Sequence, residues 1–294
     1  RVTEPTVRGT AGEDAYCVRQ INDGQSLLIW ADTAPLGDPT WTYLAADLAK
    51  VTFDLLGGSD TLSIEAGVAV PITFIGGAGD DSLIIGGGTV ALAGVEDLGS
   101  LTISGDGRLD IGTYSLVVRN GDIGQISAWL ASGMNGGSTP WTGPGINSSA
   151  AAADPAGRYA VGAGPAANPA DVLVRYTRYG DANLDGTVNF NDLLKLSQNY
   201  NTSGRNWSQG DFNHDGNVNF NDLLKLSQNY NQGIASPPAD APSSSPAAEE
   251  QPSSATTDAV LSLDDSLLVI EPRRKAEWTS LAGEILGLEP ARTP

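Results

Sequence analysis

Two twelve-residue windows of the sequence carry oxygen-bearing side chains at matching positions. Residues 181–192 read DANLDGTVNFND and residues 211–222 read DFNHDGNVNFND, each with Asp or Asn at positions 1, 3, 5, 9 and 12 and glycine at position 6. A calcium ion prefers about six to eight oxygen ligands at roughly 2.3–2.6 Å. A loop that turns sharply at a glycine can wrap one such ion, so the two windows predict two calcium sites.

Each window offers five side chains and the backbone carbonyl of position 7 as predicted calcium ligands. The first set is Asp181, Asn183, Asp185, the carbonyl of Thr187, Asn189 and Asp192. The second set is Asp211, Asn213, Asp215, the carbonyl of Asn217, Asn219 and Asp222. The residue at position 9 would bind directly or through water, and the Asp at position 12 would close the site from the first turn of a following helix.

A single window of this kind also suits a surface turn that is capped by Asp and Asn side chains. The duplication in register favours the metal, because three carboxylates in one small loop repel each other when no cation is present. His214 is the only histidine of the chain and stands at position 4, which supplies no ligand. We therefore expect its side chain to face solvent, and we assign it no role as a base.

One fourteen-residue sequence, VNFNDLLKLSQNYN, occupies residues 188–201 and again residues 218–231. The spacing of its large apolar residues predicts a short helix with one apolar face after each loop. This face consists of Phe190, Leu193, Leu196 and Tyr200 in the first copy and of Phe220, Leu223, Leu226 and Tyr230 in the second. Helices this short are unstable alone, so we expect them to bury these faces against each other while calcium binding supplies much of the folding free energy.

Residues 179–232 form two tandem loop–helix units that each close on Asp and lack a helix before the loop, and they resemble the dockerin module of secreted bacterial proteins. The resemblance implies a small all-α, EF-hand-like fold that binds two Ca²⁺ ions and docks onto a cohesin-like or other cell-envelope protein. It also implies an extracellular or cell-surface location. The sequence departs from the family at loop positions 10 and 11, where Phe190-Asn191 and Phe220-Asn221 replace the usual Ser-Thr.

Short apolar runs recur through residues 50–119, separated by Gly, Asp and Ser. Evenly spaced runs of strand length predict stacked coils. For residues 1–122 we therefore expect a right-handed parallel β-solenoid-like region, with a β-sandwich as the alternative. Cys17, in the run AYCVRQ, is expected to be a small buried residue of a strand.

The glycine- and aspartate-rich segment GGAGDDSLI at residues 76–84 resembles the nonapeptide of the repeats-in-toxin family, and weaker copies stand at 56–64 and 9–18. Repeats of this type hold calcium between coils when neighbouring copies are in phase. The two later copies start twenty residues apart, which argues against a shared ion. We favour the alternative, in which Asp60, Asp80 and Asp81 only shape the turns.

The remaining segments differ in composition. Residues 123–178 combine a helical stretch, IGQISAWLASG, with a Gly/Ala/Pro/Asn-rich part and a strand at 171–178, and are expected to form a cap or spacer. The Pro/Ser/Ala-rich residues 233–258 predict a disordered linker. Residues 259–294 predict a tail with a short amphipathic helix whose apolar stripe is Trp278, Leu281, Ala282 and Ile285. The chain is thus expected to be mainly β, with one small all-α module.

The chain has 35 acidic and 16 basic residues and a formal net charge of −19. This charge makes nucleic acid and anionic membranes poor partners. A single Cys excludes an intramolecular disulfide and a CxxC site, and a single His excludes a multi-histidine metal site. No run reaches the about 18 apolar residues that a transmembrane helix needs. Because it begins with Arg, the sequence reads as a mature or truncated piece.

Three kinds of function fit these features: a non-enzymatic attachment role, an enzymatic role and polysaccharide binding. We favour a non-enzymatic part of a secreted or cell-surface protein, in which the calcium module mediates attachment or assembly. The alternative is the C-terminal portion of a dockerin-bearing glycoside hydrolase or polysaccharide lyase that acts in polysaccharide catabolism. Its candidate carboxylates are Glu65, Asp80, Asp81, Glu96 and Asp97, which the sequence alone cannot pair at a catalytic separation. A third function, polysaccharide binding, would use exposed aromatic residues such as Trp30, Trp41, Trp129 and Trp141.

Overall fold

The structure is a computed structural model, which describes residues 2–31, 37–136 and 140–234. These residues belong to one compact unit, Arg1–Ala235, and they are mainly β, as predicted. The predicted linker from residue 235 onward lies outside the described residues, and so does the predicted tail with its helix at 259–294.

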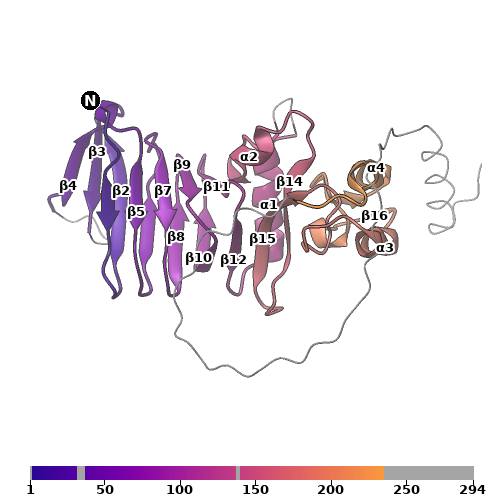
Figure 1. Ribbon diagram of the computed structural model, residues 1–294. Coiled ribbons are helices and arrows are strands. Elements are labelled where there is room, and N and C mark those ends of the chain that lie inside the picture. The colour runs from indigo at the N-terminus through magenta and orange to yellow at the C-terminus, as the bar shows by residue number, and fades with distance from the viewer. Residues whose placement is uncertain (1, 32–36, 137–139, 235–294) are drawn as a thin grey trace, which may run out of the picture. The chain divides into compact units, whose positions relative to one another are not determined.

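Most strands of the described residues belong to two sheets (Figure 1). The six-stranded sheet has the order β1 (Thr6–Arg8), β5 (Val51–Asp54), β7 (Ile72–Ile75), β9 (Thr89–Leu92), β11 (Arg108–Asp110) and β13 (Gly145–Asn147). The nine-stranded sheet has the order β14 (Tyr159–Pro165), β15 (Val172–Arg178), β12 (Ser115–Val118), β10 (Glu96–Ile103), β8 (Asp81–Ile85), β6 (Thr61–Ile64), β2 (Ala15–Ile21), β3 (Ser26–Trp30) and β4 (Trp41–Leu44).

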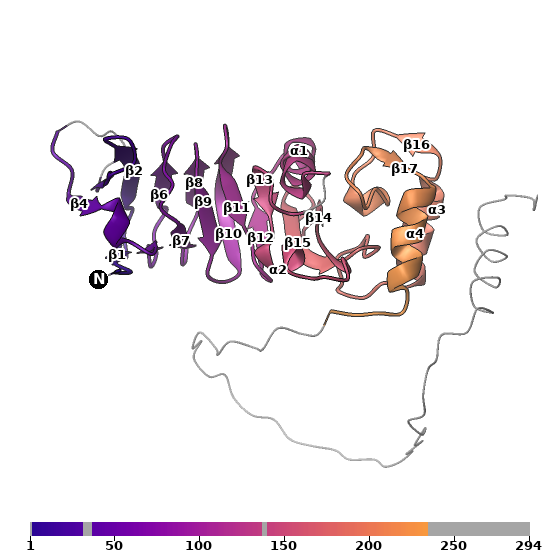
Figure 2. The ribbon, with the colours of Figure 1, turned by 90° about the horizontal axis from the view of Figure 1, so that it is seen from above.

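From β5 to β13 the chain alternates between the two sheets, so that each coil of chain adds one strand to each sheet. Neighbouring strands along this stretch are parallel in both sheets. Figure 2 shows β6, β8, β10, β12 and β15 following one another in this order. Among the described residues of these two sheets, antiparallel pairs occur only at the two ends of the nine-stranded sheet, among β2, β3 and β4 and among β12, β15 and β14.

Buried and exposed side chains alternate along these strands, as the pleat of a strand requires. In β5, Val51 and Phe53 are fully buried, whereas Thr52 and Asp54 are partly exposed. The strands β6, β7 and β9 show the same alternation. The short apolar runs of the sequence are therefore strands that bury every second residue in the core, and Cys17 is buried in β2 as predicted.

Residues 123–178 contain the predicted helix and the predicted strand, together with two strands that the sequence did not reveal. Helix α1 (Ile123–Met134) begins where the Asp122 side chain accepts hydrogen bonds from the N–H groups of Gly124 and Gln125. The strands β13 and β14 come from the Gly- and Ala-rich part. Their small residues are needed for close packing, because a Cβ atom on Gly162 of β14 would lie 2.4 Å from the Trp207 Nε1 atom.

The three glycine-rich turns of the sequence stack in successive coils. A Cβ atom on Gly79 would lie 1.6 Å from the Gly58 carbonyl oxygen, and one on Gly58 would lie 2.4 Å from the Gly12 carbonyl oxygen. Both glycines also have positive φ angles, +146° and +125°, which favour glycine. Strands of successive coils pair 21 residues apart here, as Thr61 does with Ser82. The later copies, which start twenty residues apart, therefore lie one coil apart and their turns stack, contrary to our expectation.

Carboxylates link these stacked turns to each other. Asp60 Oδ1 accepts a hydrogen bond from Asp14 N at 2.8 Å, and Asp81 Oδ1 accepts one from Asp60 N at 3.0 Å. One coil further, Glu96 Oε2 accepts a hydrogen bond from Gly76 N at 3.2 Å. Asp60, Asp81 and Glu96 are all buried. Asp60 and Asp81 therefore connect successive turns through backbone N–H groups, as a turn-shaping role requires.

The burial of Glu96 leads to a prediction about stability and pH. Burial, together with the nearby charge of Asp81, raises the pKa of Glu96 from 4.5 to about 7. Between pH 4.5 and pH 7, Glu96 keeps its proton in the folded chain but loses it in the unfolded chain. The free energy of unfolding therefore falls as the pH rises through this range. Replacing it by glutamine should make the protein more stable at pH 8, by up to about 3 kcal/mol, and should have little effect at pH 4.

Urea unfolding of the wild type and of Glu96→Gln at the two pH values measures this difference. An equal change in the free energy of unfolding at both pH values would contradict the raised pKa.

Candidate metal centre

The duplicated sequence forms two loop–helix units. Helix α3 (Phe190–Gln198) follows the first predicted calcium loop and α4 (Phe220–Asn229) follows the second. Each helix begins at an asparagine whose side chain accepts a hydrogen bond from the backbone, Asn189 for α3 and Asn219 for α4. The two asparagines have the same backbone angles, φ −145° and ψ −164°. Identical sequence thus gives an identical start to both helices.

Two buried aspartates hold the ends of the first loop together. Asp181 accepts hydrogen bonds from Asp185 N at 3.2 Å and from Gly186 N at 2.9 Å. Asp192 reaches back from α3 and accepts hydrogen bonds from Ala182 N and Asn189 N, at 2.9 and 2.8 Å. These bonds bring position 12 of the loop next to position 2, as a loop that closes around an ion requires.

The second loop repeats this arrangement. Asp211 accepts hydrogen bonds from Asp215 N at 3.2 Å and from Gly216 N at 2.9 Å. Asp222 accepts one from Phe212 N at 2.9 Å. The residue at position 4 is left-handed in both loops, with φ 58° at Leu184 and 57° at His214.

Short antiparallel backbone contacts join each loop to the segment that follows the other helix. Val188 of the first loop donates to Gln232 O at 2.9 Å and accepts from Asn231 N at 2.8 Å. Val218 of the second loop, in β17 (Asn217–Val218), accepts from Asn201 N at 2.8 Å, next to β16 (Thr202–Ser203). The two loops are therefore part of one interlocked module rather than two separate turns.

The carboxylates of these two loops include several that are buried. Burial, together with the charges of Asp192 and Asp185, raises the pKa of Asp181 to about 6. Burial and the charges of Asp222 and Asp215 raise the pKa of Asp211 to about 7. Among the described residues, none of the six loop aspartates forms an ion pair with Lys or Arg.

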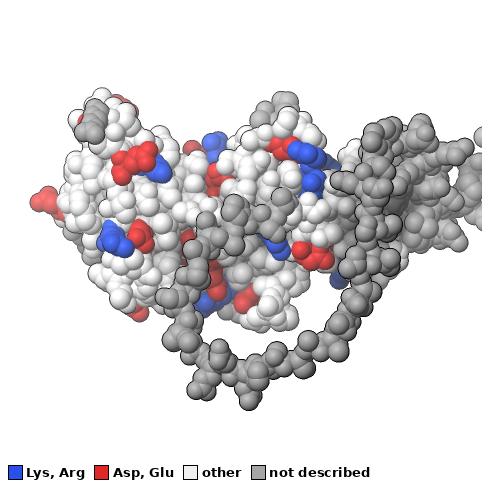
Figure 3. All heavy atoms as spheres, viewed as in Figure 1, with Lys and Arg blue, Asp and Glu red and all other residues white. Residues whose placement is uncertain are grey.

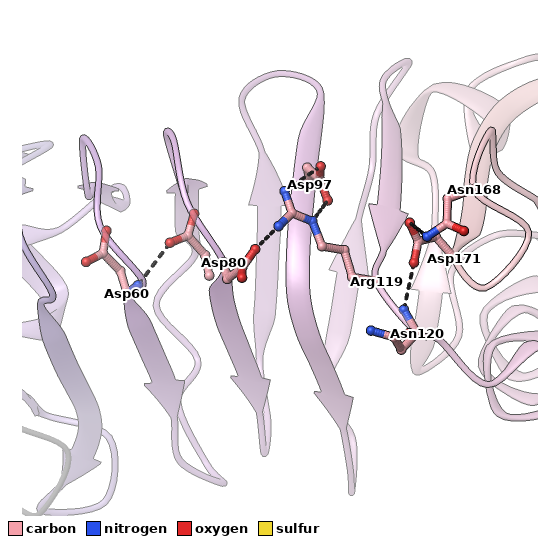
Figure 4. Close-up of polar contacts among 8 residues, drawn as sticks. Asp60, Asp80, Asp97, Arg119, Asn120, Asn168 and Asp171 are labelled. Atoms are coloured by element: carbon pink, nitrogen blue, oxygen red, sulfur yellow. Dashed lines mark hydrogen bonds and ion pairs between the residues drawn. The ribbon is translucent and has the colours of Figure 1, made fainter.

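The five carboxylates considered for glycoside chemistry, by contrast, pair with arginine or are buried. On the face shown in Figure 3, several Lys and Arg side chains adjoin Asp or Glu. Arg119 pairs with both Asp80 and Asp97 (Figure 4). Glu65 accepts hydrogen bonds from Arg19 at 2.5 and 2.6 Å. With Asp81 and Glu96 buried, each of the five carboxylates considered for glycoside chemistry has a partner within the fold.

The donor set of each loop fits a hard cation. It consists of three carboxylates, two asparagine amides and a backbone carbonyl, which are the oxygen ligands that calcium prefers. Among the described residues, Asp, Glu, His and Cys side chains alone form no group that could hold a metal ion. A site in these loops must therefore include amide or carbonyl oxygens, as the predicted ligands Asn183 and the Thr187 carbonyl would supply.

The prediction for the apolar helix faces was only partly correct. Leu193, Leu196 and Leu226 are buried. Phe190 and Phe220, however, are 53% and 63% exposed. They are the first residues of their helices. Val188 and Val218, at position 8 of the loops, are fully buried instead.

The prediction that His214 faces solvent was wrong. Its ring is half-buried, stacked on Trp207 with centroids 5.3 Å apart and in edge contact with Trp141 at 5.7 Å. Its Nε2 atom lies 3.1 Å from the Val161 carbonyl oxygen of β14. Loss of hydration lowers its pKa to about 4, so the ring is neutral near pH 7. Position 4 of the loop points at the sheet, which the sequence of the loop alone does not reveal.

The tryptophans that were candidates for polysaccharide binding are not freely exposed. Trp30 and Trp141 are buried, and Trp41 and Trp129 are half-buried. Trp129 Nε1 also donates a hydrogen bond to Ile103 O at 3.1 Å. Packing within the fold accounts for these four side chains.

Residues 179–231 are thus a duplicated, EF-hand-like loop–helix module whose predicted ligands are all oxygen atoms. The family model of the dockerin type I domain matches residues 179–231, so this segment is a dockerin-type module. The match supports calcium as its ion. No curated protein and no solved structure matches the chain. None of the helices in the described part of the chain is long and apolar enough to cross a membrane.

Proposed function

We propose that this chain is a non-enzymatic part of a secreted or cell-surface bacterial protein that uses a calcium-loaded dockerin-type module for attachment or assembly. Each of the two loops would hold one Ca²⁺ ion through the ligands predicted from the sequence. The observation that carries the proposal is the pair of equivalent loops, each with a buried aspartate at positions 1 and 12 and no basic partner among the described residues.

The other described regions support a structural role. From β5 to β13 the chain alternates between the two sheets, and the neighbouring strands of this stretch are parallel. We interpret this arrangement as a β-solenoid stalk that carries the module. The five carboxylates considered for glycoside chemistry are ion-paired or buried, which favours the non-enzymatic function over a glycosidase or lyase. The dockerin match favours an extracellular or cell-surface location.

The partner would contact the exposed apolar residues at the starts of the two helices. Phe190 and Leu194 of α3 are exposed, and so are their counterparts Phe220 and Leu224 of α4. The two residues of each pair are four positions apart on one helix and therefore adjoin on its surface. A contiguous exposed apolar patch of this kind marks an interaction site. These residues include loop position 10, where the related dockerins usually have Ser. A cohesin-like domain with a more apolar contact surface would suit them.

A binding assay with the whole chain and a panel of cohesin domains tests the proposal. We expect at least one cohesin to bind in calcium and to dissociate in chelator. The double variant Phe190→Asp, Phe220→Asp should weaken binding at least about 100-fold, because apolar anchors at an interface contribute several kcal/mol.

The matched control is Leu44→Asp, which places the same charge at an exposed apolar residue of β4, 62% exposed. It should leave the affinity unchanged. Binding that survives in chelator, or that responds equally to both sets of substitutions, would contradict the proposed contact.

A further inference from the structure

The first calcium loop is held by side chains from outside the segment that the dockerin family model matches. Thr177 of β15 donates a hydrogen bond from its hydroxyl to Asp181 Oδ2. Arg175, on the same strand, donates from Nη1 to the Leu184 carbonyl oxygen at 2.7 Å. The loop therefore accepts one hydrogen bond from β15 at position 1 and another at position 4.

These two donors are fixed by the sheet rather than by the loop. β15 lies between β12 and β14, with Arg175 opposite Ser115 and Thr177 opposite Ala160. The Thr177 side chain is fully buried. Its hydroxyl is therefore in place before any ion binds, and it can orient the carboxylate of Asp181 in advance.

The hydrogen bond from Arg175 stabilises Leu184, the loop residue whose backbone conformation is unfavourable. Leu184 has a φ of 58°, in the left-handed region, which disfavours a leucine by about 1–2 kcal/mol. Because Arg175 binds the carbonyl of this residue, it holds the loop in the conformation that brings positions 3 and 5 together.

The second loop has no equivalent of Thr177. The residue four positions before Asp181 is Thr177, whereas the residue four positions before Asp211 is Trp207. Among the described residues, Asp211 accepts hydrogen bonds from the backbone N–H groups of Asp215 and Gly216 and from no side chain. Trp207 instead donates from Nε1 to the Asp181 carbonyl oxygen at 2.6 Å, which adds a further contact to the first loop.

We propose that Thr177 and Arg175 are positioning residues of the first calcium loop and make it the tighter of the two sites. This inference rests on the proposed function, in which both loops bind calcium. The physical reason is preorganisation, because a ligand that is already oriented loses less freedom when the ion binds. Hydrogen bonds to ligating carboxylates commonly change metal affinity by about 10–100-fold.

Calcium titration of the whole chain, with one loop disabled at a time, tests this inference. In the Asp215→Ala background only the first loop binds, and Thr177→Val should weaken binding about tenfold. In the Asp185→Ala background only the second loop binds, and the same substitution should change its affinity less than twofold. Thr177→Ser keeps the hydroxyl and should restore the affinity of the first loop. Arg175→Met, which keeps the apolar stem, provides a second variant with the same expected pattern if Thr177→Val does not fold.

Equal weakening of both loops, or no weakening of the first, would overturn the inference. It would also fail if Thr177→Ser were as weak as Thr177→Val, because packing and not the hydroxyl would then set the affinity. If the wild-type chain binds two calcium ions but the variants give one of these contrary results, only this inference is wrong. If the wild-type chain binds no calcium, the proposed function is contradicted as well.

Discussion

Replacing Asp185 by alanine should reduce the number of calcium ions that the chain binds from two to one, and Asp215→Ala should do the same at the other loop. Asp185 and Asp215 stand at position 5 of their loops, and both are exposed, so neither substitution leaves a cavity in the core. Each would remove one of the three predicted carboxylate ligands of its loop. We expect the affinity of the altered loop to fall by about 100-fold or more, because ligand charge sets the affinity of such sites.

Isothermal titration of the two single variants measures both stoichiometry and affinity. The control is Asp106→Ala, which removes an exposed carboxylate far along the sequence from both loops and should leave two sites. If either single variant lost both ions, the loops would be cooperative rather than independent. If neither variant lost an ion, the assigned ligands would be wrong.

Chelation of calcium should unfold the dockerin-type module while the β sheets remain. Asp181, Asp192, Asp211 and Asp222 are buried, and without a cation their charges oppose folding. When free calcium is about 100 times the dissociation constant, each site stabilises the folded state by about 2.7 kcal/mol. Two sites therefore supply about 5 kcal/mol, which is comparable to the stability of a small domain.

Circular dichroism and thermal melting with and without chelator follow this effect. We expect loss of helical signal and a lower melting temperature in chelator, both restored by calcium. The double variant Asp185→Ala, Asp215→Ala should not respond to calcium. A melting curve of the wild type that is the same in calcium and in chelator would show that the loops fold without the ion.

The features that the sequence predicted correctly depend on residues that are close together along the chain. The paired loops and their turn glycines Gly186 and Gly216 follow from spacing within twelve residues, and in both loops the Asp at position 1 accepts the same backbone hydrogen bonds. The calcium ligands themselves stay a prediction. The buried positions Leu193 and Leu196 follow from helical periodicity. Local spacing was sufficient in these cases because one short segment contains all of the interacting groups.

The features that were missed depend on contacts between distant segments. His214 is covered because Trp141 and Val161 lie next to it, and neither is near it in sequence. The strand β14 needs a glycine at position 162 because Trp207 packs directly on it. The glycine-rich turns are in phase because one coil spans the interval between them, which becomes visible only in the strand register.

Calcium titration of the whole wild-type chain tests most directly whether each of the two loops binds one calcium ion. The structure predicts saturable binding with a stoichiometry near two. Absence of binding at millimolar calcium, which is the weakest range known for extracellular calcium modules, would contradict it.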